Sequence, residues 1–104
     1  MVMGLDERVR SAVAALLHAS GESQGDLAAG LGVSQAQVSR RQSGTASWSL
    51  AHCDAVAAHY GIDVLDLLAG PTRAVQALPD ERRRVTGRNT ATARPETVGE
   101  GGAR

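Results

Sequence analysis

The segment QGDLAAGLGVSQAQVSRRQSG, residues 24–44, has a glycine in the middle of what is otherwise one long helical pattern. Gly32 lies between Leu31 and Val33, and a glycine inside a helix costs about 1 kcal/mol relative to alanine. We interpret Gly32 as the end of one helix, because glycine adopts the left-handed backbone of a helix C-terminus without steric penalty. Ser34 then caps a new helix. The segment therefore predicts two short helices joined by a tight turn.

The residues around this turn suit two helices that pack closely at a steep angle. Ser23 caps the first helix, with Asp26 three residues on, and Ser34 with Gln37 has the spacing of a capping box. Ala28 is small enough to let the second helix approach the first. This arrangement is a helix-turn-helix. Its shared core is expected to contain Leu27, Leu31, Val33 and Val38.

Apolar residues at helical spacing predict three further helices, over about 6–19, from Ser49 to a C-terminal cap at Gly61, and from Asp63 onward. The residues expected to face the core in these helices are Val9, Val13, Leu16, Leu17, Leu50, Cys53, Val56, Ala57, Tyr60, Leu65, Leu67 and Leu68. The helical pattern fades beyond residue 70. Residues 71–85 are expected to form a linker or short helix, and residues 86–104, which lack periodicity, a disordered tail.

Composition limits the class of protein. The 104 residues include no phenylalanine, which favours small packed helices over a sheet. A single cysteine cannot form an intramolecular disulfide, and no apolar run reaches the roughly 18–20 residues of a membrane span. His18, His52 and His59 lack metal-ligand spacing, and no nucleophile elbow or phosphate loop is present. We expect a cytoplasmic protein without membrane partner, metal, cofactor or enzymatic activity.

Residues 5–69 resemble the phage-repressor/Cro class of helix-turn-helix domains, the Xre-type family. The motifs of the resemblance are SQGDLA at 23–28, LGVSQAQVS at 31–39 and WSLAHCDAVAAHYGIDVLDLL at 48–68. The resemblance implies an all-α, compact five-helix lambda-repressor-like domain over residues 5–70, followed by the disordered C-terminal tail. It also implies a DNA-binding regulator that associates with the nucleoid through double-stranded DNA.

The helix over 34–43 is polar on nearly every side except Val38, whereas a purely structural helix needs an apolar stripe to bury. The resemblance implies that its first residues face base edges in the major groove. The implied base contacts are Gln35, Ala36, Gln37, Ser39 and Arg40, and the capping box competes for Gln37. The implied phosphate contacts are Gln24, Ser34, Arg41, Ser43, Thr45 and Ser47, with the backbone N–H groups of residues 44–47.

Three residues depart from the family pattern. Arg41 stands where an apolar residue is usual, and Gln42 where an acid is common. We expect Arg41 to bury its stem and hold its guanidinium in solvent or on a phosphate. Trp48, where the family often has proline, is expected to fill the space left behind as a packing residue.

Charge divides the chain into two parts. Up to Gly70 four arginines face seven acids, whereas the remaining residues hold seven arginines and four acids. Phosphate neutralisation normally supplies much of the affinity for DNA, and the first part has little to offer. Arg82, Arg83 and Arg84 form either an electrostatic arm for DNA or part of a solvated tail.

Two functions from different classes follow. The first is a dimeric repressor that recognises two half-sites about 34 Å apart. Its dimer contacts are expected from Leu65 and Leu68, or from Val75 and Leu78. The second is a protein-interaction module, such as an antitoxin or an adaptor, whose C-terminal tail binds a protein partner. Fold alone does not decide between them.

Overall fold

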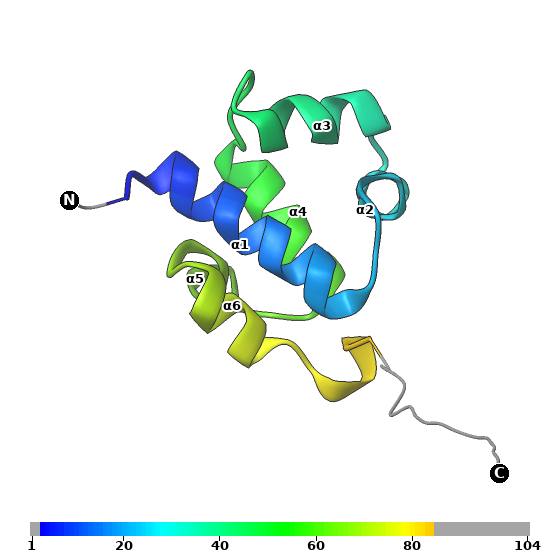
Figure 1. Ribbon diagram of the computed structural model, residues 1–104, viewed down its shortest axis with the longest axis vertical. Helices are drawn as coiled ribbons and strands as arrows, with labels where there is room; N and C mark the ends of the chain where they lie inside the picture. The colour runs from blue at the N-terminus through cyan, green and yellow to red at the C-terminus, as the bar shows by residue number, and fades with distance from the viewer. Residues whose placement is uncertain (1–2, 85–104) are drawn as a thin grey trace, which may run out of the picture.

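The computed structural model describes residues 3–84, and within this range helices are the only regular elements, without strands (Figure 1). Its six α-helices are α1 (Leu5–Ser20), α2 (Gln24–Leu31), α3 (Gln35–Ser43), α4 (Leu50–Tyr60), α5 (Val64–Leu68) and α6 (Pro71–Ala77). A short 3₁₀ turn, η1 (Asp80–Arg82), follows α6. The all-α class is confirmed. Five helices lie within residues 5–70, and residues 71–77, expected to be a linker or short helix, form a sixth; the predicted tail lies outside the described residues.

The turn between α2 and α3 has the geometry predicted from Gly32. This residue has a φ of +73°, in the left-handed region that glycine favours. Its N–H donates to Ala29 O at 3.3 Å, and the N–H of Val33 donates to Ala28 O at 3.0 Å. These two bonds satisfy carbonyls that the end of a helix otherwise leaves unpaired. The chain therefore stops α2 and starts α3 within a few residues.

The core lies around α1, which crosses the middle of the molecule and contacts α3, α4, α5 and α6 (Figure 1). Its largest fully buried side chains are Tyr60, Leu16, Leu27, Leu67, Val13, Val38 and Val56. Leu31 and Val33 are partly buried and pack against this core. The hydrophobic faces predicted for α1 and for the α2–α3 pair are therefore largely the observed ones.

Two leucines expected in the core are instead exposed. Leu50 keeps 76% of its surface in contact with solvent, because it is the first residue of α4 and lies beyond the edge of the core. Leu65 is 70% exposed. The five-residue helix α5 can bury only one side, and Leu67 occupies the buried position.

The packed unit extends past residue 70 through α6. Gly70 enters the helix at a φ of +116°, and Pro71 forms its first turn, where a missing N–H costs nothing. Ala74 and Leu78 are buried in the common core, and α6 makes the most extensive helix–helix contact of the fold, with α1. Leu78 is therefore not available as a dimer contact in this conformation.

None of the helices within residues 3–84 has the length and apolar content needed to cross a lipid bilayer.

Candidate nucleic-acid interface

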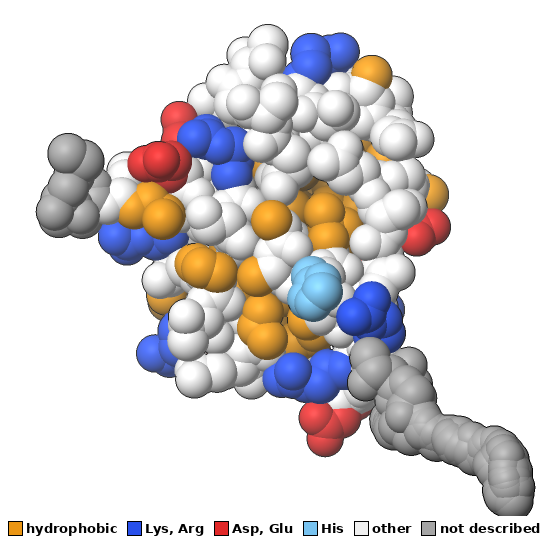
Figure 2. All heavy atoms as spheres, in the orientation of Figure 1, with side chains coloured by type: hydrophobic (Ala, Val, Ile, Leu, Met, Phe, Trp, Pro, Cys, Tyr) orange, Lys and Arg blue, Asp and Glu red, His pale blue; other side chains and the backbone are white. Residues whose placement is uncertain are grey.

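Helix α3 lies at one end of the molecule, with the body of the fold on one side of it (Figure 1). Its exposed side chains are Gln35, Ala36, Ser39, Arg40 and Ser43, which we call the α3 face. Val38, on the opposite side of the helix, is fully buried. The predicted base contacts other than Gln37 therefore share one exposed surface. Figure 2 shows no acidic side chain over α3 on the visible side of the molecule.

The start of α3 is fixed by a reciprocal capping box. Ser34 Oγ accepts the Gln37 N–H at 3.2 Å, and Gln37 Oε1 accepts the Ser34 N–H at 2.9 Å. This satisfies two backbone donors that the first turn leaves unpaired. The predicted capping box is confirmed, and it leaves only the NH₂ group of the Gln37 amide for any other partner.

The end of α3 is tied to the rest of the fold by Gln42. Its Nε2 donates to Arg10 O on α1 at 3.1 Å, and its Oε1 accepts from Trp48 Nε1 at 2.9 Å. Trp48 is only 7% exposed, which confirms that it is a packing residue. One amide side chain thus connects α3 to α1 and to the loop before α4. Gln42 was not singled out from sequence as a structural residue, because both of its partners depend on the tertiary fold.

Arg41 differs from its prediction. Its guanidinium lies 5.5 Å from the ring centroid of Trp48, a cation–π distance. Its Nε and Nη1 are buried and have no hydrogen-bond partner within residues 3–84. Two of the three guanidinium nitrogens therefore lie out of solvent beside the indole, so the expectation of a guanidinium in solvent or on a phosphate is met at most in part by this half-buried side chain. A phosphate could reach these two nitrogens only after the side chain moved.

Several predicted phosphate contacts already have partners within the chain. Ser43 Oγ donates to Arg40 O at 3.1 Å and lies 3.0 Å from Thr45 Oγ1. Ser47 Oγ donates to Asp6 Oδ2 at 3.2 Å, which places a carboxylate beside a proposed phosphate site. Two of the expected backbone donors in residues 44–47 are also used, since the Gly44 N–H bonds to Arg41 O and the Ala46 N–H to Arg40 O.

The first turn of α2 lies beside the start of α3. Gln24 is the half-buried first residue of α2, and the side chain of Gln35 reaches the neighbouring Gly25. Asp26 accepts the Ser23 N–H at 2.9 Å in its own capping box, and the hydrogen bonds from Ser23 lower the pKa of its carboxyl. The structure thus places Gln35, a predicted base contact, beside the first turn of α2, which begins with the predicted phosphate contact Gln24.

The distribution of charge around α3 suits an anionic ligand better than the net charge of the residues up to Gly70 indicates. No aspartate or glutamate occurs from Leu27 to Cys53, which spans α3 and both of its flanking turns. Arg40 is exposed and makes no ion pair within residues 3–84. Arg10 also makes none, and its Cζ lies 3.6 Å from where a Cβ on Gly44 would stand. Arg10 is a cation near α3 that sequence reasoning missed, because α1 and α3 are distant along the chain.

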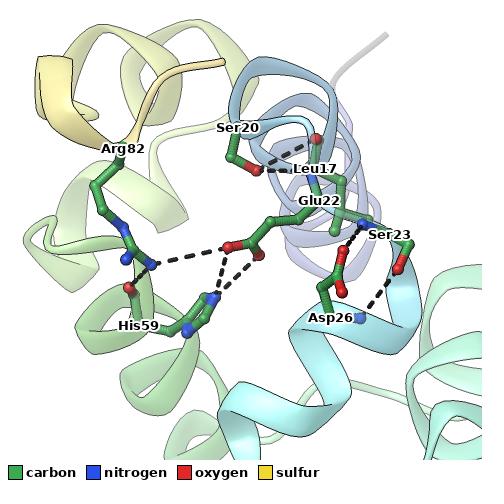
Figure 3. A network of polar contacts seen from close by, with 7 residues as sticks. All are labelled: Leu17, Ser20, Glu22, Ser23, Asp26, His59 and Arg82. Atoms are coloured by element: carbon green, nitrogen blue, oxygen red, sulfur yellow. Dashed lines mark hydrogen bonds and ion pairs between the residues drawn. The ribbon is translucent and has the colours of Figure 1, made fainter. Parts of the chain in front are cut away.

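The arginines at 82–84 bond to the body of the fold, so the expectation that they belong to a free, solvated tail is wrong. Glu22 accepts from His59 Nε2 at 3.0 Å and lies 3.9 Å from Arg82 Nη2, while Arg82 also donates to His59 O (Figure 3). We call Glu22, His59 and Arg82 the Glu22 clasp. Arg83 pairs with Asp80 at 3.5 Å, and the Arg84 N–H donates to Ala19 O at 2.7 Å. The cluster is therefore not part of a free tail, and η1 lies at the far end of the molecule from α3 (Figure 1).

Other reactive residues have ordinary structural surroundings. Cys53 is buried on α4, and burial raises the pKa of its thiol, with smaller contributions from Asp6 and Asp54. His52 shares a 2.7 Å hydrogen bond with Ser49, the N-cap of α4. Within residues 3–84, no three His, Cys, Asp or Glu side chains are grouped closely enough to hold a metal ion.

A scan against protein-family models gave no match to this chain, and searches of curated proteins and of solved structures gave none either.

Proposed function

We propose that this protein is a sequence-specific regulator that binds double-stranded DNA with α3 in the major groove. The observation that supports the proposal best is the α3 face, a polar and acid-free surface on a helix anchored from behind by Val38 and Gln42. The turn at Gly32 joins α2 and α3 as a helix-turn-helix requires. We further propose the lambda-repressor-like arrangement for this unit.

The chemistry of the α3 face suits base-edge recognition. Gln35 can pair bidentately with adenine N6 and N7, and Arg40 with guanine O6 and N7. The Ala36 methyl can contact a thymine methyl, and Ser39 has one donor and two acceptor positions. Gln24 at the start of α2, Ser34 and the cation of Arg10 are the groups best placed for phosphates.

A dimer fits this function, because one such unit covers about half an operator. Leu65 on α5 remains a candidate dimer contact, since it is a large apolar side chain with most of its surface exposed. The simplest regulatory action is repression, in which the bound dimer excludes polymerase from a promoter.

The test is selection of binding sites from a random duplex pool at physiological salt. Enrichment of a palindrome whose half-sites lie about one helical turn apart is the expected result. Replacing Arg40 with alanine should remove that enrichment, whereas Arg73→Ala should keep it, because Arg73 lies on α6 and pairs with Asp66. A folded protein that enriches no sequence would refute the proposal.

A second candidate is a protein-interaction module of the antitoxin or adaptor type. It is favoured by the internal bonding of Ser43, Thr45 and Ser47 and by the burial of Arg41, which leave few groups for phosphates. The same selection separates the two candidates, because an interaction module would enrich no duplex. A partner would then be captured by the full chain and lost on removal of residues 86–104.

A further inference from the structure

Gly25, the second residue of α2, has no side chain, and the side chain of Gln35 lies close to where one would begin. A Cβ placed on Gly25 would stand 3.3 Å from Gln35 Oε1 and 3.7 Å from Gln35 Cδ. Ser23 Oγ would lie 3.5 Å from the same point. The terminal amide of Gln35 therefore lies beside the bare Cα of Gly25, in a position that we call its seat.

The backbone does not require a glycine at this position. Five glycines of the described chain have a positive φ, and Gly25 is not among them. Alanine is the better residue inside a helix, so a glycine there is unexplained by local conformation. A methyl group there would stand 3.3 Å from Gln35 Oε1, so the amide would have to move by a few tenths of an ångström.

We propose that Gly25 is a specificity-determining residue that acts by positioning the Gln35 amide. The inference rests on the proposed function and assigns to α2 a part in base recognition. A bidentate contact with adenine needs the amide nitrogen and oxygen in one plane at a set height in the groove. A side chain already resting in a seat loses less rotamer freedom on binding than one that is free in solvent.

The displacement of the Gln35 amide should increase with the size of the side chain introduced at position 25. Gly25→Ala shifts a flexible amide by a few tenths of an ångström, because the contact would be only slightly too short. Gly25→Met fills the seat and forces the amide away. Neither change introduces charge, so the non-specific attraction to phosphates is unaffected.

The experiment is a double-mutant cycle on DNA discrimination. Affinity is measured for the enriched duplex and for a duplex altered at the base pair that Gln35→Ala ceases to discriminate. We expect Gly25→Met to reduce discrimination about tenfold, Gly25→Ala to reduce it less, and neither to lower affinity for the enriched duplex further when Gln35 is already alanine. Gly4→Ala is the matched control, since nothing lies within 4 Å of a Cβ there. Full discrimination by Gly25→Met, or an equal loss of affinity for the enriched duplex in the Gln35→Ala background, would overturn the inference.

A measurement without DNA separates this inference from the proposed function. In the free protein, the Gln35 side-chain amide resonances report on this contact, because Gln35 Oε1 and Cδ lie beside Gly25. Gly25→Met should shift the Gln35 NH₂ resonances, and Gly4→Ala should leave them in place. Wild-type protein that binds all duplexes equally overturns the proposed function together with the role of Gly25. Selective wild-type binding with unchanged Gly25→Met selectivity overturns the inference alone.

Discussion

At the residue scale, Tyr60 has the most unusual surroundings of any titratable group described. It is fully buried at the end of α4, and its hydroxyl has no hydrogen-bond partner within residues 3–84. Burial raises the pKa of this hydroxyl well above its ordinary value, and the nearby carboxylate of Glu22 raises it further. Ionised tyrosine is therefore incompatible with the native packing.

This raised pKa predicts a loss of stability in alkali. Unfolded Tyr60 releases its proton near pH 10, whereas the folded protein retains it. The contribution of Tyr60 is thus complete below about pH 10 and declines as the pH rises further. Because Tyr60 is the only tyrosine, absorbance of tyrosinate reports on it directly. We expect this absorbance to appear together with loss of helical circular dichroism, and Tyr60→Phe to flatten the decline. Tyrosinate formed near pH 10 in a fully helical protein would contradict the prediction.

Arg41 is expected to lower the stability of the protein. Two of its guanidinium nitrogens are buried without partners, and such groups cost about 1–3 kcal/mol each in desolvation, offset in part by Trp48. Arg41→Met keeps the stem and removes the charge, so the free energy of unfolding should rise by about 1 kcal/mol. Urea unfolding measures this change. The exposed Arg40→Met serves as control and should shift stability by less than about 0.5 kcal/mol. A destabilised Arg41→Met protein would show that the guanidinium is satisfied in solution.

At the scale of elements, the position of α3 depends on the Gln42 amide. Gln42→Ala removes the bonds to Arg10 O and Trp48 Nε1 and leaves a buried donor unpaired. We expect a loss of about 1–3 kcal/mol in the free energy of unfolding. Fluorescence of Trp48, the only tryptophan, should move to longer wavelength as water reaches the indole. Gln35→Ala on the exposed side of α3 should change neither property. An unshifted spectrum in Gln42→Ala would mean that packing alone positions Trp48.

The Glu22 clasp is expected to hold η1 against α1 and α4. Glu22→Gln weakens the contacts to His59 and Arg82, which are partly exposed, so the overall loss of stability should be only about 1 kcal/mol. The effect on local opening of the segment around η1 should be larger than the effect on overall stability. Hydrogen exchange at the Arg84 amide, which donates to Ala19 O, should become faster than in the wild type. Glu7→Gln, which alters an exposed carboxyl with no ion pair within residues 3–84, should leave this exchange unchanged.

The helix ends could be predicted because local chemistry determines them. Ser34 with Gln37 and the left-handed Gly32 act within a few residues of each other, and both appear in the structure as expected. Leu50 and Leu65 were misplaced because hydrophobicity alone does not say where the core ends. Helix α6 was uncertain from sequence because its buried residues, such as Ala74, are explained by contact with α1 rather than by their own pattern.

At the scale of the whole molecule, the candidate site could be predicted only in outline. Spacing along one helix is enough to place Gln35, Ala36, Ser39 and Arg40 on a single surface. The partners that occupy Ser47 and Arg41 could not be predicted, since Asp6 and Trp48 reach them through the tertiary fold. Net charge was also a poor guide, because it does not reveal that carboxylates are absent from the segment containing α3.

The central claim is that the α3 face is the surface that meets DNA. The most direct measurement is amide chemical-shift mapping of the isotope-labelled protein during titration with the enriched duplex. Shifts should concentrate at residues 34–44 and at the start of α2, while the Glu22 clasp and α6 remain unchanged. Shifts centred on α5 and α6, or none at all with a verified duplex and folded protein, would contradict the claim.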